Sequence, residues 1–217
     1  MDNASGMDQT WLRVGGIAGI ATVFGYMTVL FAPLPWAFRR SLFFALGLGG
    51  IIFVLGLDRM LKLHSRAVTR EIATLFGIIG MAVMNLMAVV QNSIDVLMKQ
   101  GIPSAKDTTT LQMVDWVRRS VNSVQLGMDI SFDIFFLVSV MLFGISMLRH
   151  PRFGAKFGIP GCAVGAATLG LNLYSFPLPP EPDLGPLVAL WLCIVAVRML
   201  FSAGYVDRSR FEPSSKK

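Results

Sequence analysis

The chain has few charged residues for its length, and this scarcity decides its class. Only 15% of its 217 residues are Asp, Glu, Lys or Arg, whereas 54% are hydrophobic. A soluble domain carries about a quarter charged residues, so the composition excludes an ordinary soluble protein and indicates a membrane protein. The net charge of +6 does not predict a nucleic-acid partner, because the basic residues flank apolar segments instead of forming one patch.

Histidine and cysteine are also scarce, with two residues of each. His64 and His150 lie outside the apolar segments, so the membrane interior has no histidine to act as a catalytic base or a haem ligand. Cys162 and Cys193 lie inside apolar segments without metal-ligand spacing, which is typical of buried thiols. The sequence contains no phosphate-binding glycine loop, zinc motif or nucleotide fingerprint. We therefore expect no enzyme, no cofactor and no metal site.

Six apolar segments suit membrane-spanning helices, and no sequence feature marks a second domain. The polar breaks between them contain clustered charge or proline, such as the stretch from Pro177 to Pro182, which cannot be helical. We predict an all-α bundle of six transmembrane helices with a polar, disordered tail at residues 207–217. The predicted spans are residues 14–31, 42–57, 72–98, 126–148, 157–176 and 184–205.

An amphipathic segment precedes the fourth span and predicts an extra helix outside the membrane. Thr109 followed by Gln112 is a capping-box pattern, which marks a helix start. At 100° per residue, the segment then separates a polar face from a valine-rich face. We predict a helix at residues 110–125 that projects from the membrane or lies along its outer surface. The same helix should run without a break into the fourth span, to about Leu148, with Gly127 as the place for a bend. The polar face carries Asp115, Arg118, Asn122, Gln125, Asp129 and Asp133, and the apolar face carries Val114, Val117, Val121, Val124 and Met128.

The distribution of Lys and Arg predicts the orientation of the chain. The two termini and the second and fourth loops hold 13 of the 19 basic residues. Because cytoplasmic segments carry an excess of Lys and Arg, both termini are expected in the cytoplasm. The amphipathic helix and the third loop are then outside.

Three predicted spans carry polar side chains at a similar depth in the outer third of the membrane. With a rise of 1.5 Å per residue, Asp129 lies about 5 Å below the outer boundary and Asp133 about 10 Å below it. Ionisable groups inside a membrane normally face a partner, a cavity or water, and they mark a functional site. We therefore predict a binding site made by Asp133, Asp129, Asp95, Asn92, Gln91, Asn172 and Gln125.

Each of these residues also has a structural interpretation. Asp95 and Asp129 are close enough to the boundary to reach water, or Lys99 and Arg118, and intramembrane asparagines often join helices. The deeper Asp133 has no basic residue at its level, which favours a function there. If the carboxylates converge, at least one must be protonated, or the site must hold a cation or open to water.

Several features follow one another in the order of a known layout: a short basic start, an acidic-edged fourth span, the turn LRHPRFGAKFGIPG and a Pro-rich last outer loop. This layout resembles an uncharacterised bacterial family of six-span membrane proteins with a domain of unknown function, most closely from Leu126 to Phe201. The resemblance implies a bundle in the bacterial plasma membrane and supplies no substrate. Size and span count are also similar to the substrate-binding membrane subunits of energy-coupling-factor vitamin transporters.

Two functions are open at this point, both with the lipid bilayer as the environment. In the first, an outward-facing polar pocket binds a cation, a proton or a small polar solute for transport or sensing. In the second, the chain is a non-catalytic accessory subunit whose outer helix binds another protein or a second copy. The polar stripe of residues 115–133 should point into a cavity in the first case and toward a partner or lipid headgroups in the second.

Overall fold

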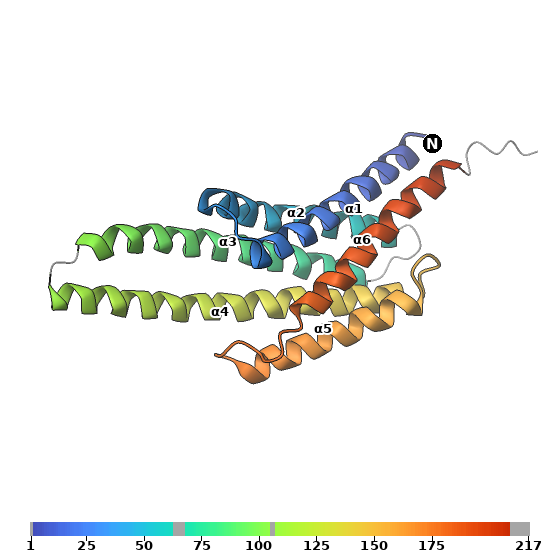
Figure 1. The fold of residues 1–217 in the computed structure, drawn as a ribbon. Coiled ribbons are helices and arrows are strands. Elements are labelled where there is room, and N and C mark those ends of the chain that lie inside the picture. Colours follow the sequence, from blue (N-terminus) through green and yellow to red (C-terminus); the bar gives the residue numbers. More distant parts are fainter. Residues whose placement is uncertain (1, 63–67, 105–106, 209–217) are drawn as a thin grey trace, which may run out of the picture.

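The computed structural model describes residues 2–62, 68–104 and 107–208, with side chains at 9–62, 68–94, 96, 98 and 107–203. These residues form six helices and no strand, and each helix is long and apolar enough to cross a membrane (Figure 1). The prediction of an all-α protein with six apolar helices is confirmed. The helices are α1 (Asp2–Phe31), α2 (Trp36–Lys62), α3 (Val68–Ser104), α4 (Thr108–Met147), α5 (Ala155–Ser175) and α6 (Gly185–Arg208).

The amphipathic segment and the fourth span form one continuous helix, α4. Asp107 caps its start, because its Oδ1 accepts a hydrogen bond of 2.8 Å from the backbone N–H of Thr110. With 37 and 40 residues, α3 and α4 are about 55 Å and 60 Å long, roughly twice the hydrocarbon core of a bilayer. Their outer parts project from the bundle side by side in Figure 1. We call residues 91–104 and 107–125 the outer hairpin.

The C-terminal end differs slightly from the prediction. Helix α6 continues through Arg208, so the first two residues of the predicted tail are helical. The other residues of that tail, 209–217, lie outside the described part of the chain.

Small residues set how closely neighbouring helices approach. A Cβ atom on Gly15 of α1 would lie 2.8 Å from the Cα of Gly56 on α2. A Cβ atom on Gly144 of α4 would lie 2.8 Å from the backbone oxygen of Gly158 on α5. Both distances are too short for a real side chain, so glycine is required for the helix backbones to pack this closely.

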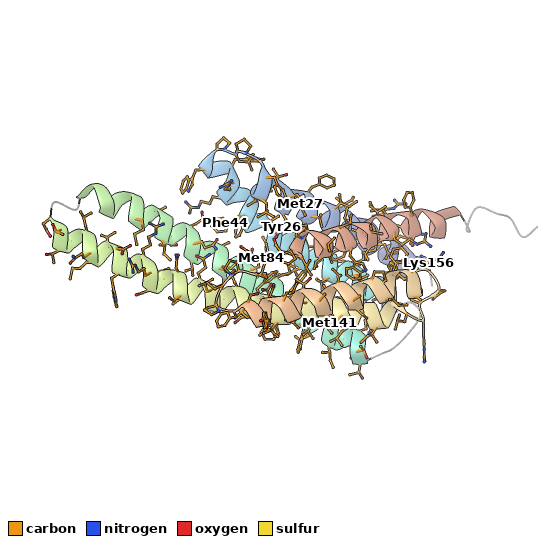
Figure 2. All side chains as sticks on the ribbon, turned by 60° about the horizontal axis from the view of Figure 1, so that its bottom comes forward. Tyr26, Met27, Phe44, Met84, Met141 and Lys156 are labelled. Atoms are coloured by element: carbon orange, nitrogen blue, oxygen red, sulfur yellow. The ribbon has the colours of Figure 1, made fainter. Side chains whose placement is uncertain are left out.

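Buried apolar side chains form two clusters along the bundle. The larger cluster, around Leu57, Met60 and Met199, fills the half that is nearer the two termini. The smaller cluster, around Leu46 and Met84, lies toward the other end. Large apolar side chains also project outward from the helices, which suits a bundle surrounded by lipid (Figure 2).

Candidate functional site

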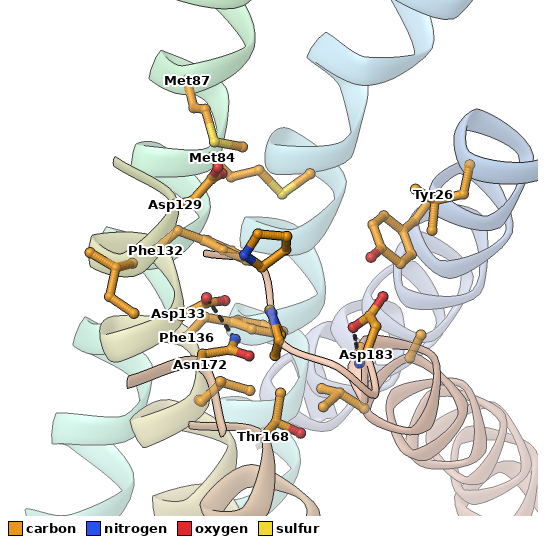
Figure 3. A pocket seen from close by; sticks show the side chains of 18 of the residues that line it. Tyr26, Met84, Met87, Asp129, Phe132, Asp133, Phe136, Thr168, Asn172 and Asp183 are labelled. Atoms are coloured by element: carbon orange, nitrogen blue, oxygen red, sulfur yellow. Dashed lines mark hydrogen bonds between the residues drawn. The ribbon is translucent and has the colours of Figure 1, made fainter. Parts of the chain in front are cut away.

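A cavity of about 510 Å³ lies within the bundle (Figure 3). It is in the half that faces away from the start of α1 and the end of α6. All six helices and the loop between α5 and α6 contribute to its wall. Most of the wall is apolar and continues the smaller core cluster. The polar side chains on the wall are Thr22, Tyr26, Asp129, Asp133, Thr168, Asn172 and Asp183.

Asp133 and Asn172 face each other across the boundary between α4 and α5. The Nδ2 group of Asn172 donates a hydrogen bond of 2.7 Å to Oδ2 of Asp133. The antiparallel register of the two helices produces this pair. Gly144 of α4 packs on Gly158 of α5. Asp133 lies on the same face of α4 as Gly144, eleven residues earlier, and Asn172 lies on the same face of α5 as Gly158, fourteen residues later.

Asp129 lies one turn of α4 closer to the outer hairpin and also lines the cavity. It is partly buried. Among the described residues, no basic side chain forms an ion pair with Asp129 or Asp133. The two carboxylic groups are one helical turn apart on the same cavity wall, so they repel each other when both are ionised. Of the seven predicted site residues, the structure thus brings Asp129, Asp133 and Asn172 to the wall of one cavity.

Tyr26 and Asp183 also lie on the polar part of the wall, and neither was predicted from the sequence. Asp183 accepts a hydrogen bond of 2.8 Å from the backbone N–H of Gly185, which fixes its carboxylate at the start of α6. Figure 3 shows the Tyr26 hydroxyl pointing toward Asp183, across the cavity from Asp133 and Asn172. One signal was available, because Tyr26 lies near the outer end of the predicted span 14–31 and Asp183 directly precedes the predicted span 184–205, both next to proline-containing breaks.

Gln91, Asn92 and Gln125, also predicted as site residues, do not line this cavity. Asn92 donates a hydrogen bond of 2.7 Å to the carbonyl of Ala88 on its own helix. Gln91 and Gln125 are partly buried at the base of the outer hairpin. The side chain of Asp95 lies outside the described part of the chain.

The register of α3 on α4 explains why the depths expected from the sequence for residues 91 and 92 differ from their positions in the structure. Gly80 packs against Phe136, and Ser139 donates a hydrogen bond of 2.7 Å to the carbonyl of Ala73. Continued outward, this antiparallel register places residues 91 and 92 opposite Gln125, two turns beyond Asp133. The predicted span 72–98 ends at Met98, and a count inward from there puts residues 91 and 92 about 10 Å below the boundary, level with Asp133.

A second polar cluster lies at the opposite end of the bundle and was also missed. The Arg70 side chain is only 2% exposed, and its Nε lies 2.8 Å from Oδ1 of Asp58. The same oxygen accepts a hydrogen bond of 3.1 Å from Thr74. Glu71 lies 3.2 Å from another guanidinium nitrogen of Arg70. These contacts tie the end of α2 to the start of α3, and we interpret them as structural.

Comparison of the chain with protein-family models, curated proteins and solved structures finds no match. The site is therefore interpreted from its own chemistry. Within the part of the chain that the structure describes, no group of three or more His, Cys, Asp or Glu side chains could hold a metal ion. The carboxylates of the cavity are thus spread around its wall and do not form a chelating cluster.

Proposed function

We propose that this is a membrane protein whose cavity binds a small solute from the outer side of the membrane, for transport or sensing. Asp133 carries the proposal, because it lies in a cavity of about 510 Å³ and is positioned by Asn172 from a second helix. An ionisable group inside a bilayer is costly and usually marks a site of function. The cavity volume is in the range of known small-molecule sites.

We also propose a bacterial plasma-membrane location with both termini in the cytoplasm. The excess of Lys and Arg at the termini and in the second and fourth loops supports this orientation. The cavity lies away from both termini, so the same orientation places it toward the outside. The bacterial location follows from the resemblance of the layout to the six-span family.

Cysteine labelling from outside the cell tests whether the cavity is open to water. Ile130 lines the cavity between the two carboxylates of α4, and Ile130→Cys in a Cys162→Ser, Cys193→Ala background places a thiol there. A membrane-impermeant maleimide should label it faster than Ile194→Cys, whose side chain is 48% exposed on α6 and does not line the cavity. Met113→Cys on the outer hairpin, 67% exposed, gives the rate for a thiol in water.

If Ile130→Cys is labelled no faster than Ile194→Cys, the cavity is closed to the outer solution and the proposal fails. Labelling by the same reagent from the cytoplasmic side only would contradict the proposed orientation.

The outer hairpin supports a second candidate function, that of an accessory subunit that binds a protein partner or a second copy. Met113, Trp116 and Val124 share one face of α4, and Trp116 is 70% exposed. Tryptophan is enriched in the centres of protein interfaces. Chemical cross-linking of intact membranes tests this function: Trp116→Arg should remove a cross-linked product and leave the labelling of Ile130→Cys unchanged. A wild-type chain that forms no cross-linked product would exclude it.

A further inference from the structure

We infer that the ligand of the cavity is a lipophilic organic cation, meaning a protonated amine or a quaternary onium ion with an apolar body. The inference rests on the proposed binding function and adds the chemical class of the ligand. Three properties of the wall support it: the sign of its charges, the hydrogen-bonding groups that remain unused, and the nature of its apolar surface.

The charged groups on the cavity wall are all acidic. Asp129 and Asp133 come from α4, and Asp183 comes from the loop before α6. Of the described residues that line the cavity, none is Lys, Arg or His. A cation that entered the cavity would therefore meet carboxylates without displacing an internal partner, and an anion would meet only repulsion.

Around Asp133 and Asn172, the hydrogen-bonding groups of the cavity wall that remain unused are mainly acceptors. One of the two amide N–H groups of Asn172 donates to Asp133, and the hydroxyl of Thr168 donates a bond of 2.7 Å to the carbonyl of Val164. The carboxylate of Asp133 keeps a second oxygen, and Asp129 has no hydrogen bond to another described residue. A ligand rich in acceptors, such as a sugar or a carboxylate, would find few donors here.

The apolar part of the wall suits a large cation of low charge density. Met81, Met84 and Met87 of α3 supply polarizable thioethers, and Phe132 and Phe136 of α4 supply aromatic rings. Aromatic faces attract onium groups, and methionine adapts to ligands of varied shape. A metal ion would need carboxylates gathered at one point, which the described residues do not provide.

Protection from labelling by two ions of the same shape and opposite charge tests the inference. Tetraphenylphosphonium and tetraphenylborate differ mainly in the sign of their charge. Tetraphenylphosphonium should slow the maleimide reaction of Ile130→Cys, and it should do so at a concentration at least about tenfold lower than tetraphenylborate. Adding Asp133→Asn should raise the protecting concentration of the phosphonium about tenfold.

Asp115→Asn is the matched control, because it removes a carboxylate from the same helix, α4, at an exposed position where Asp115 pairs with Arg119. It should leave the protecting concentration unchanged. Asp129→Asn repeats the test at a cavity carboxylate with no hydrogen-bond partner among the described residues, in case Asp133→Asn does not fold.

The possible failures are distinguishable. Equal protection by the two ions, stronger protection by the borate, or protection by neither would overturn the cation inference while Ile130→Cys remains labelled. An Ile130→Cys thiol that is not labelled in the absence of either ion would instead overturn the proposed function. An equal effect of Asp115→Asn and Asp133→Asn would show that the phosphonium responds to overall charge and not to this cavity.

Discussion

The side-chain nitrogen of Asn172 lies 2.7 Å from Oδ2 of Asp133, and this hydrogen bond joins α5 to α4 inside the cavity. The amide can donate to the carboxylate and equally to the carbonyl oxygen of the protonated acid. In both states the bond fixes the orientation of the Asp133 side chain. The second oxygen of Asp133 has no hydrogen bond to another described residue and is left for a ligand.

A double-mutant cycle on this pair should give a measurable coupling. Asn172→Leu leaves the partly buried Asp133 without its donor, and we expect a loss of about 1–3 kcal/mol in the free energy of unfolding. Asp133→Asn keeps an acceptor and should cost less than Asp133→Leu. The coupling between positions 133 and 172 should be about 1 kcal/mol, as for other hydrogen bonds in membranes. Unfolding in mixed detergent micelles measures it, and a coupling of zero would show that the contact does not stabilise the fold.

The helices were predictable because each one is a long apolar run bounded by proline or charge. The continuity of α4 was also predicted, because the polar stripe of residues 115–133 runs into the fourth apolar span without a break. Nothing in the sequence breaks the helix there. Gly127, where a bend could occur, has no neighbour within 4 Å of a Cβ atom built on it, so no packing forces a change of direction.

The site was only partly predictable from the sequence. Asp133 and Asp129 were found because carboxylates within an apolar run are costly and rare. Tyr26 and Asp183 were missed because tyrosine at a membrane boundary and aspartate in a loop are both common. The exclusion of residues 91 and 92 from the cavity depends on the register between α3 and α4, which side-chain packing at Gly80 sets and which hydropathy does not encode.

The buried ion pair at the other end of the bundle should contribute far more to stability than the exposed pair on α4. Asp58→Asn leaves the guanidinium of Arg70 with Glu71 as its remaining carboxylate, and we expect a loss of about 3 kcal/mol. Asp115→Asn breaks the exposed pair with Arg119 and should cost less than about 1 kcal/mol. Unfolding in mixed micelles measures both variants. Equal losses would show that the Arg70 cluster has no structural role.

Glycine-to-alanine substitutions at two positions of α4 should change stability in opposite directions. A Cβ atom at Gly144 would lie 2.8 Å from the backbone nitrogen of Cys162, so Gly144→Ala must push α5 away and should cost about 1–3 kcal/mol. Gly127→Ala has open space and should gain up to about 1 kcal/mol from helix propensity. Thermal unfolding in detergent compares the two.

The Gly144→Ala substitution should also weaken the contact between Asp133 and Asn172, because the same face of α5 carries both contacts. The coupling measured by the double-mutant cycle should therefore fall in this background. An unchanged coupling would mean that α5 does not move as a rigid helix.

A reporter enzyme that works only in the cytoplasm should be active when it is fused after Lys217, and one that works only after export should be inactive there. The reason is that 13 of the 19 basic residues are on the side of the termini. A reporter inserted between residues 105 and 106, in the third loop of the predicted topology, should show the opposite activity. An activity of the C-terminal fusion that requires export would reverse the orientation, and the cavity would then open toward the cytoplasm.

The backbone amides at the start of α4 should lose protection from hydrogen exchange at low pH, because Asp107 caps this helix. The backbone N–H and the hydroxyl of Thr110 both donate to this exposed carboxylate, and these hydrogen bonds lower the pKa of Asp107. A lowered pKa in the folded state means that the cap is complete above the ordinary pKa of aspartate, near about 4, and is lost as the pH falls through the lower folded value. The hydrogen-exchange protection factors of residues 110–113 should fall several-fold in that window. Asparagine also caps helices but carries no charge, so the hydrogen-exchange protection factors of Asp107→Asn should not change with pH in that window. The same pH dependence in Asp107→Asn and in the wild type would assign the effect to another group.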